Sequence, residues 1–405
     1  MQKKSVLITC YNLEIGGIER SLIGLLENFD YGAYDVDLLL YNRHGPFLAS
    51  LPQAVNLLPE IPAYANAFRN PLMRVVREGH FLLTAARVAA KLSIKLYGYR
   101  KNTHDESYLH GQRFWKYILP LLPRIEKPYD VALSFAGPHY CVSNLVDAKV
   151  KLGWLHSDYS ELAIDESEEL KMSTGLNYLV AVSEECRRIY IKRFPLLAEK
   201  TIVIENILCG ELVRRQASEF NIDSDMPKEH GVTRILSIGR FTYQKGFDDA
   251  VCACRILIDL GYRIRWYLIG FGPDDSILRQ LIAQNRLENR FIILGTKPNP
   301  YPYIFGCDIY VQPSRYEGKA VTVREAQMLA RPVLITRFAT SASQVEEGVD
   351  GHICTLGVDG IVDGVRRLVD DDQYKNSLAL NAAARNYDNK KEVTKLCSII
   401  QNHSI

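Results

Sequence analysis

Short runs of β-branched and other apolar residues alternate with helical patterns along this chain of 405 residues, and the alternation occurs twice. The first series runs from Ser5 to Ile204, and a second begins at Thr233 after a polar, acid-rich segment at 209–231. Alternating strands and helices predict a parallel sheet with helices on both faces. We therefore expect two doubly wound, Rossmann-like α/β domains, in agreement with a length above that of one typical domain.

The apolar runs give the expected strands. In the first domain they are 5–11, 35–41, 131–135, 151–155, 178–182 and 201–204, with a helix at 18–28 and a long helical stretch at 65–122. In the second they are 234–238, 265–269, 290–294, 308–312, 332–336 and 351–354, with helices at 247–260, 276–284 and 323–329. We assign residues 1–208 to the first domain and 209–380 to the second, with 209–231 as the interdomain connection. Residues 381–405, the end of a helical pattern over 373–401, are expected to return to the first domain.

Two glutamates separated by seven residues, Glu317 and Glu325, stand where the apolar strand at 308–312 gives way to the helix at 323–329. In open parallel sheets, ligands bind beyond the carboxyl ends of the strands, where helix amides can face an anion. Glu325 could accept two hydrogen bonds from a diol such as that of ribose, or it could form a capping box with Thr322. Glu317 could accept hydroxyls of a sugar, or it could simply be solvated.

A glycine-bearing turn, Gly239 to Gly246, follows the strand at 234–238. Arg240 offers a planar guanidinium that can bind a diphosphate through two hydrogen bonds, and Lys245 offers a compact positive charge. Together they suit a diphosphate and the negative charge that grows on it when it leaves. The alternative is that both are surface cations in water.

The first domain offers two further candidates. Gly16 and Gly17 follow the first strand and open a helix, so the backbone there can approach a phosphate or sugar closely; the alternative is an ordinary tight turn. His156 follows the strand at 151–155 and could donate to a sugar hydroxyl or to a developing charge. The alternative is a histidine whose hydrogen bonds are satisfied by neighbouring backbone.

Together, these clusters resemble the retaining GT-B glycosyltransferases of glycosyltransferase family 4, also called glycosyl transferases group 1, most strongly from Thr233 to Cys354. The resemblance implies two Rossmann-like domains facing a cleft, the first binding the acceptor and the second the donor. It also implies a role for each candidate: Gly239, Arg240, Lys245 and Gly246 bind the donor diphosphate, Glu325 holds the ribose, Glu317 contacts the donor sugar, and the backbone of Lys319, Ala320 and Val321 faces the phosphates. By the same resemblance, Gly16 and Gly17 form the amino-terminal glycine loop, and His156 is the active-site histidine beside the donor sugar.

The sequence departs from the family pattern at two positions. Lys319 stands where the family usually has an apolar aromatic residue, which adds attraction for a diphosphate and could alter the donor preferred. Ala330 stands ahead of Arg331 and Pro332 where a glycine is common. That change should affect how the helix ends more than it affects chemistry.

The resemblance implies transfer of a sugar from a nucleotide-diphosphate sugar, UDP- or GDP-linked, to a hydroxyl acceptor with retention of anomeric configuration. The expected setting is bacterial surface polysaccharide biosynthesis: capsule, O-antigen (lipopolysaccharide) or exopolysaccharide. Two alternatives stay open, namely a nucleotide-sugar epimerase of GT-B architecture and a non-catalytic nucleotide-sugar-binding subunit. A dinucleotide oxidoreductase is disfavoured because Gly16-Gly17 is not the Gly-x-Gly-x-x-Gly fingerprint.

Composition narrows the setting further. A formal net charge of +2 gives no global field that would gather nucleic acid, and we expect no nucleic-acid partner. Most of the nine cysteines sit in apolar runs, as free thiols of a reducing compartment do. The first apolar run is too short for a signal peptide, and no run reaches the ~18 residues of a membrane helix. We expect a cytoplasmic enzyme with no cofactor beyond its donor substrate, and a metal-independent one, because no acidic motif or cysteine pair has suitable spacing.

A basic stretch at 69–101 suggests a membrane partner. It holds eight basic residues against a single acid, Glu78, and apolar residues lie among them. Such a segment suits the anionic inner face of the plasma membrane, where a lipid-linked glycan acceptor would be found. The alternative is a solvated helix face that covers the core of the first domain. The basic residues are Arg69, Arg74, Arg77, Arg87, Lys91, Lys95, Arg100 and Lys101.

Overall fold

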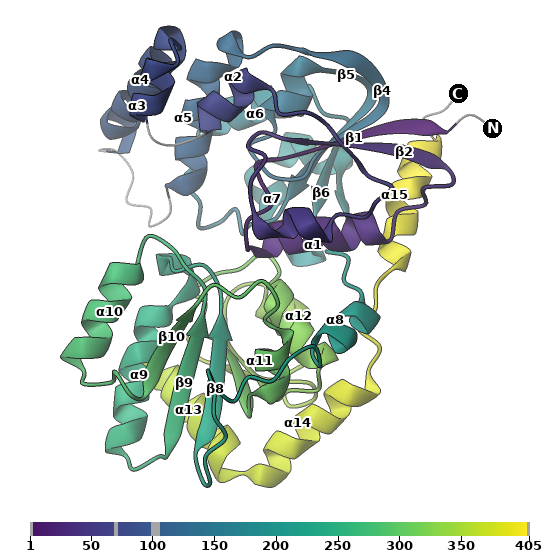
Figure 1. The fold of residues 1–405 in the computed structure, drawn as a ribbon. Helices are drawn as coiled ribbons and strands as arrows, with labels where there is room; N and C mark the ends of the chain where they lie inside the picture. Colours follow the sequence, from purple (N-terminus) through teal and green to yellow (C-terminus); the bar gives the residue numbers. More distant parts are fainter. Residues whose placement is uncertain (1–2, 69–71, 99–105, 403–405) are drawn as a thin grey trace. The chain divides into compact units, whose positions relative to one another are not determined.

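A computed structural model of the chain describes residues 3–68, 72–98 and 106–402 (Figure 1). The chain divides into two units, each built on one parallel sheet. The first unit comprises Met1–Glu14, Ile18–Ile207 and Lys390–Ile405, and the second comprises Ile15–Gly17 and Leu208–Asn389. The prediction of two parallel-sheet α/β domains is confirmed.

Within the described residues, the first unit has a seven-stranded sheet in the order β3-β2-β1-β4-β5-β6-β7. Its strands are β1 Lys4–Cys10, β2 Tyr34–Leu40, β3 Asn56–Leu57, β4 Ile125–Ser134, β5 Val146–Leu155, β6 Tyr178–Ala181 and β7 Thr201–Val203. Its helices are α1 Gly17–Glu27, α2 Pro62–Phe68, α3 Leu72–Arg77, α4 Phe81–Gly98, α5 Ser107–Ile118, α6 Glu166–Thr174, α7 Glu184–Arg193 and α15 Lys391–Asn402.

Both faces of this sheet are buried. Successive side chains of a strand point in opposite directions, so neighbouring residues lie in different apolar clusters. Ile8 of β1 belongs to the apolar cluster that also holds residues of α1 and α15, whereas Leu7 belongs to the cluster on the other face. In α1, Leu22, Leu25 and Leu26 follow the helical period and are fully buried. The parts of these strands that are buried on both faces, such as 6–8 in β1, therefore appear in the sequence as short apolar runs.

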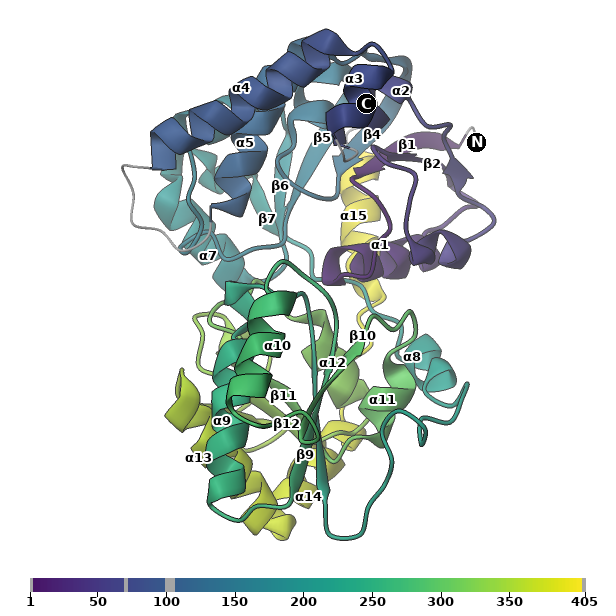
Figure 2. The same ribbon diagram turned by 60° about the vertical axis from the view of Figure 1, so that its left-hand side comes forward.

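The second unit has a six-stranded sheet in the order β10-β9-β8-β11-β12-β13, counted over the described residues. Its strands are β8 Thr233–Ile238, β9 Ile264–Ile269, β10 Phe291–Gly295, β11 Ile309–Gln312, β12 Val333–Thr336 and β13 His352–Cys354. Its helices are α8 Gly210–Gln216, α9 Phe247–Asp259, α10 Asp275–Gln284, α11 Tyr301–Gly306, α12 Val321–Met328, α13 Val358–Asp370 and α14 Asp372–Ala384. Figure 2 shows α9, α10 and α13 on one side of this sheet and α8 and α11 on the other. Since β8 and β11 are neighbours, the loops that follow them meet at one edge.

Two sequence-based expectations need correction. The segment 209–231 is more than a connection, because Val213, Ile222 and Met226 are buried in the core of the second unit. The pattern over 373–401 is not one helix: α14 ends at Ala384, and α15 starts at Lys391 after a polar stretch. Only α15 packs into the first unit, where its buried apolar side chains are Val393, Leu396 and Ile400.

Candidate active site

The turn after β8 is shaped by Gly246. A short 3-10 turn, Tyr243–Lys245, leads into it, and α9 begins at the next residue. Gly246 has a left-handed backbone with φ of 63°, and a Cβ atom placed there would lie 2.1 Å from the carbonyl oxygen of Pro313. Only glycine fits this close approach. The turn that contains Gly246 therefore packs closely against the segment that follows β11.

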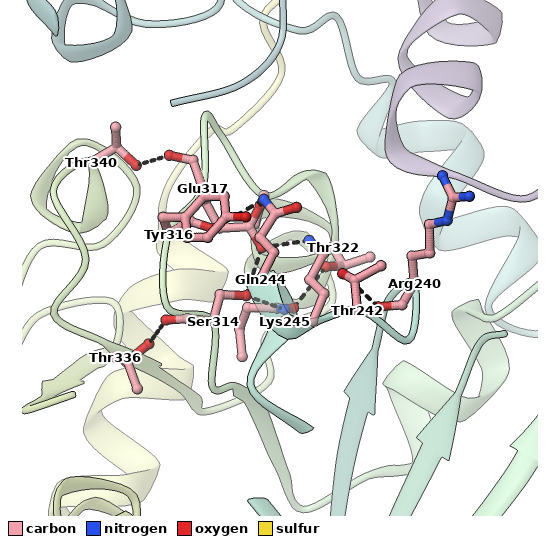
Figure 3. Close-up of polar contacts among 12 residues, drawn as sticks. Arg240, Thr242, Gln244, Lys245, Ser314, Tyr316, Glu317, Thr322, Thr336 and Thr340 are labelled. Carbon is pink, nitrogen blue, oxygen red and sulfur yellow. Dashed lines mark hydrogen bonds and ion pairs between the residues drawn. The ribbon is translucent and has the colours of Figure 1, made fainter. Parts of the chain in front are cut away.

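Lys245 and Glu317 form an ion pair across these two segments (Figure 3). The Nζ atom of Lys245 lies 2.5 Å from Oε1 of Glu317, and their side chains are only 17% and 6% exposed. Glu317 is therefore not a solvated loop residue, and that alternative is wrong. The alternative of a surface cation in water is wrong for Lys245. Because an ammonium group has three N–H donors and Glu317 takes one, two remain for another acceptor.

Glu317 is held by further donors. Ser314 Oγ donates to its Oε1 at 2.6 Å, and Gln244 Nε2 lies 3.4 Å from its Oε2. The carbonyl oxygen of Glu317 accepts from Thr340 Oγ1 at 2.8 Å. Backbone and carboxylate are therefore both fixed, which keeps the Lys245 ammonium at one position.

Buried polar residues that the sequence analysis missed support this arrangement. Gln312 accepts hydrogen bonds from Tyr310 at 2.8 Å and Thr322 at 3.2 Å, and its own amide donates to Ser314 Oγ at 2.8 Å. Thr336 Oγ1 donates to the Ser314 carbonyl. The sequence could have indicated these residues through Gln312, which ends an otherwise apolar strand, and Ser314 two residues later, since buried polar groups need partners.

Glu325 lies in a different environment. Helix α12 begins at Val321 with Ala320 as its N-cap, so Thr322 is not the cap and the capping-box interpretation is wrong. The Glu325 side chain is fully buried, and its Oε1 accepts a hydrogen bond from the Tyr301 hydroxyl at 2.9 Å. The amide of Ala320, expected to face phosphates, donates to Gln344 Oε1 at 3.0 Å.

Arg240 is exposed, and in Figure 3 its guanidinium points away from the Lys245–Glu317 pair. The structure therefore does not bring the two predicted diphosphate ligands, Arg240 and Lys245, together. Lys319 is half-buried in the loop before α12.

In the first unit, His156 follows β5 and lies with Nε2 2.8 Å from the carbonyl oxygen of Phe135. Because a carbonyl only accepts, Nε2 carries the proton. Burial lowers the pKa of His156 to about 4, so the ring is neutral at pH 7. The backbone-satisfied interpretation is therefore confirmed for this nitrogen, and a sugar hydroxyl would meet an acceptor at Nδ1. Helix α1 begins at Gly17, directly after Gly16, as predicted.

Residues 218–386 match the model of the family Glycosyl transferases group 1. The matched residues make up most of the second unit. Among them, Gly239, Lys245 and Glu317 lie at the edge where β8 and β11 end.

Curated relatives match over part of their length. The amylovoran biosynthesis glycosyltransferase AmsK of Erwinia amylovora is 32% identical over 136 residues, which is 32% of this chain and 33% of AmsK. The putative colanic acid biosynthesis glycosyltransferase WcaL of Salmonella typhimurium is 32% identical over 127 residues, 29% of this chain and 31% of WcaL. The chain thus aligns with about a third of the length of each of these relatives.

A solved structure matches the whole chain. The crystal structure of HepE from Anabaena in complex with UDP and glucose aligns with a TM-score of 0.72 over 99% of this chain and 100% of HepE, at 15% identity. Identity this low establishes the fold alone. The chain has the GT-B fold, with one parallel sheet in each of its two α/β units.

Proposed function

We propose that this protein transfers a glycosyl group from a nucleotide-diphosphate sugar, UDP- or GDP-linked, to a hydroxyl acceptor. The observation that carries the proposal is the Lys245 ammonium, fixed by Glu317 directly before the amino terminus of α9. Breaking the bond between sugar and diphosphate puts negative charge on the leaving phosphate, and a positioned cation beside helix amides lowers that barrier. The family match and the glycosyltransferase names of the relatives support this reaction class.

We further propose that transfer retains the anomeric configuration and uses no covalent sugar–enzyme intermediate. Glu317 is a poor nucleophile because its carboxylate is engaged by Lys245, Ser314 and Gln244. This favours attack by the acceptor hydroxyl on the face from which the diphosphate leaves. In this proposal Glu325 binds the ribose, and its hydrogen bond from Tyr301 fixes the carboxylate.

Metal independence belongs to the same proposal. In the part of the chain that the structure describes, no group of three or more His, Cys, Asp or Glu side chains is placed to hold a metal ion. Lys245 would supply the positive charge at the leaving group. Transfer should continue undiminished after treatment with a chelator, and loss of activity that returns with a divalent cation would contradict this part.

The acceptor we propose is a bacterial surface polysaccharide, or its lipid-linked precursor, extended at the cytoplasmic face of the membrane. AmsK and WcaL are named for amylovoran and colanic acid biosynthesis, respectively, and both support a polysaccharide acceptor.

Replacing Lys245 tests the reaction. Lys245→Ala should reduce transfer at least about 100-fold while the protein stays folded, because a preorganised charge at the leaving group is lost. The matched control is Lys375→Ala, which removes a lysine of the same unit that pairs with Asp372 on α14. A panel of nucleotide sugars with glycan acceptors supplies the assay, read as released nucleoside diphosphate and as product. Near-normal turnover of folded Lys245→Ala would defeat the proposal, and an altered sugar formed from labelled donor without acceptor would indicate an epimerase.

The basic segment at 69–101 is refined by the structure. Along α4, Phe81, Ala85, Val88 and Leu92 follow the helical period on the outer face, and Phe81 is 67% and Leu92 57% exposed. Arg87 does not belong to this face: it is buried, and its Nη1 donates to the carbonyl of Asn66 at 3.2 Å. Arg69, Arg100, Lys101 and the side chain of Lys95 lie outside the described residues.

The exposed apolar side chains of α3 and α4, flanked by Arg77 and Lys91, fit an anionic bilayer surface, and we propose that they bind the inner face of the plasma membrane. None of the described helices is long and apolar enough to cross a membrane. The interpretation as a purely solvated face accounts poorly for Leu82, which is 74% exposed.

Vesicle flotation tests this surface. The protein should float with vesicles that contain phosphatidylglycerol and much less with neutral vesicles, and added salt should weaken binding. The double variant Phe81→Glu/Leu92→Glu should lose at least about tenfold in affinity, since two charges would face the acyl boundary. Leu196→Glu, at an exposed leucine of the same unit, is the control. Failure of the unchanged protein to bind at moderate salt would rule the surface out.

A further inference from the structure

The segment after β11 carries an arginine that lies outside every predicted site. We propose that Arg315 is a positioning residue that fixes Lys245, by tying both sides of the Lys245 turn to the segment after β11. The proposal rests on the function proposed above, because positioning matters only if Lys245 serves the donor.

On one side, Arg315 holds the short turn that contains Lys245. Its backbone N–H donates to the carbonyl of Gln244 at 2.8 Å, and its Nη1 donates to the carbonyl of Tyr243 at 2.7 Å. The guanidinium carbon also lies 4.2 Å from the centre of the Tyr243 ring, within the range of a cation–π contact. Two of the three residues of the turn are thereby fixed by this one residue.

On the other side, Arg315 holds the first turn of α9. Nη1 and Nη2 bind the two carboxylate oxygens of Asp248 at 2.9 and 2.8 Å, and Nη2 also binds Asp249 at 2.7 Å. Serving two carboxylates and a carbonyl at once requires the planar five-donor guanidinium. A lysine could not reproduce this set.

Lys245 lies between these two anchored points, at the residue before Gly246. The same two segments meet again where Gly246 contacts Pro313 and where Gln244 Nε2 donates to the carbonyl of Tyr316 at 3.0 Å. The turn 243–246 and the segment 313–317 therefore contact each other along their length. Arg315 supplies charged contacts between them, and the Lys245–Glu317 ion pair is another.

The positive charge of Arg315 has a second effect on Lys245. Asp248 and Asp249 stand at the amino terminus of α9, where a diphosphate would otherwise be favoured by the helix dipole. Arg315 pairs with both carboxylates. Without it, two negative charges a few residues from Lys245 would attract the ammonium away from Glu317.

A double-mutant cycle tests the proposal through donor binding. Arg315→Ala should weaken the affinity for UDP or GDP about tenfold, measured by calorimetry, but less than about twofold in a Lys245→Ala background. Arg315→Lys should recover only part of the loss, and Arg279→Ala, which removes an exposed arginine paired with Asp275, should change nothing. An equal loss in both backgrounds, or no loss at all, would overturn the role of Arg315.

The position of Lys245 can also be read without any donor. In nuclear magnetic resonance spectra of protein with isotope-labelled lysine, the ammonium protons of Lys245 should exchange slowly with water, and Arg315→Ala or Arg315→Lys should accelerate that exchange. An unchanged Lys245 signal in both variants would overturn the proposal whatever the donor affinity. If the signal changes but Lys245→Ala keeps full donor affinity, the proposed function fails while the positioning by Arg315 stands.

Discussion

Replacing Gly246 by alanine isolates the close approach between the Lys245 turn and Pro313. The left-handed backbone alone costs an L-residue about 1–2 kcal/mol. The new methyl carbon would also begin 2.1 Å from the Pro313 carbonyl oxygen, so the two segments must separate by more than an ångström to reach ordinary contact. Overpacking of this kind adds about 1–3 kcal/mol. We expect Gly246→Ala to lower the free energy of unfolding by about 2–5 kcal/mol.

Gly261 supplies a matched control, because its φ is 90° and a Cβ atom there would meet nothing within 4 Å. Gly261→Ala should therefore lose only the backbone cost, about 1–2 kcal/mol, and the gap of about 2 kcal/mol between the variants measures the contact with Pro313. Urea unfolding gives the free energies, and hydrogen exchange in β8 and β9 assigns the loss to the second unit. Separation of the two segments should also weaken nucleoside-diphosphate binding in Gly246→Ala alone. Equal losses in the two variants would refute the reasoning.

Three further predictions concern stability. Ala330 has a left-handed φ of 53°, so Ala330→Gly should raise the free energy of unfolding by about 0.5–1 kcal/mol in urea titrations, and a loss would contradict this. Burial raises the pKa of Glu169 from 4.5 to about 7, so its contribution to stability is present below pH 4.5 and is lost as the pH rises through about 7. Relative to the unchanged protein, Glu169→Gln should therefore gain about 3 kcal/mol between pH 4.5 and pH 8, and a difference that stays flat with pH would exclude the shift. Glu317→Leu should lower the free energy of unfolding by about 3 kcal/mol, because it leaves the Lys245 ammonium without its carboxylate. Adding Lys245→Met should restore more than half of that loss, and additive losses in the double variant would contradict the coupling.

The strands that are apolar on both faces could be predicted almost to the residue. All four residues of β11 and of β12 are buried, and the first three of each strand form a continuous apolar run. Strands β4 and β5 begin several residues earlier than expected, because their first halves carry exposed charges such as Lys127 and Lys149. The two-residue strand β3 has too little sequence to give a periodic signal.

The location of the candidate site could also be predicted, but its contacts could not. The turn with Lys245 and the segment with Glu317 are joined across 72 residues because β8 and β11 are neighbours in the sheet, and the strand and helix patterns alone place both loops at one edge. The direction of each side chain depends on local backbone angles that residue spacing does not encode. Arg240 therefore points away from the Lys245–Glu317 pair although its position in the motif matches. Arg315 contacts the Lys245 turn although no motif marks it.

Helix α15 has a consequence for how the protein is made. It fills the core of the first unit with Val393, Leu396 and Ile400, and the Lys4 side chain donates to the carbonyl of Ile400 at 3.0 Å. During synthesis, β1 to β7 leave the ribosome before this helix exists, and residues 208–389 of the second unit are translated in between. The half of the protein that is made first is thus completed last. Until then the nascent chain carries an uncovered apolar surface beside α1, which is where we expect chaperones to bind it and where shortening of the carboxyl terminus would do its damage.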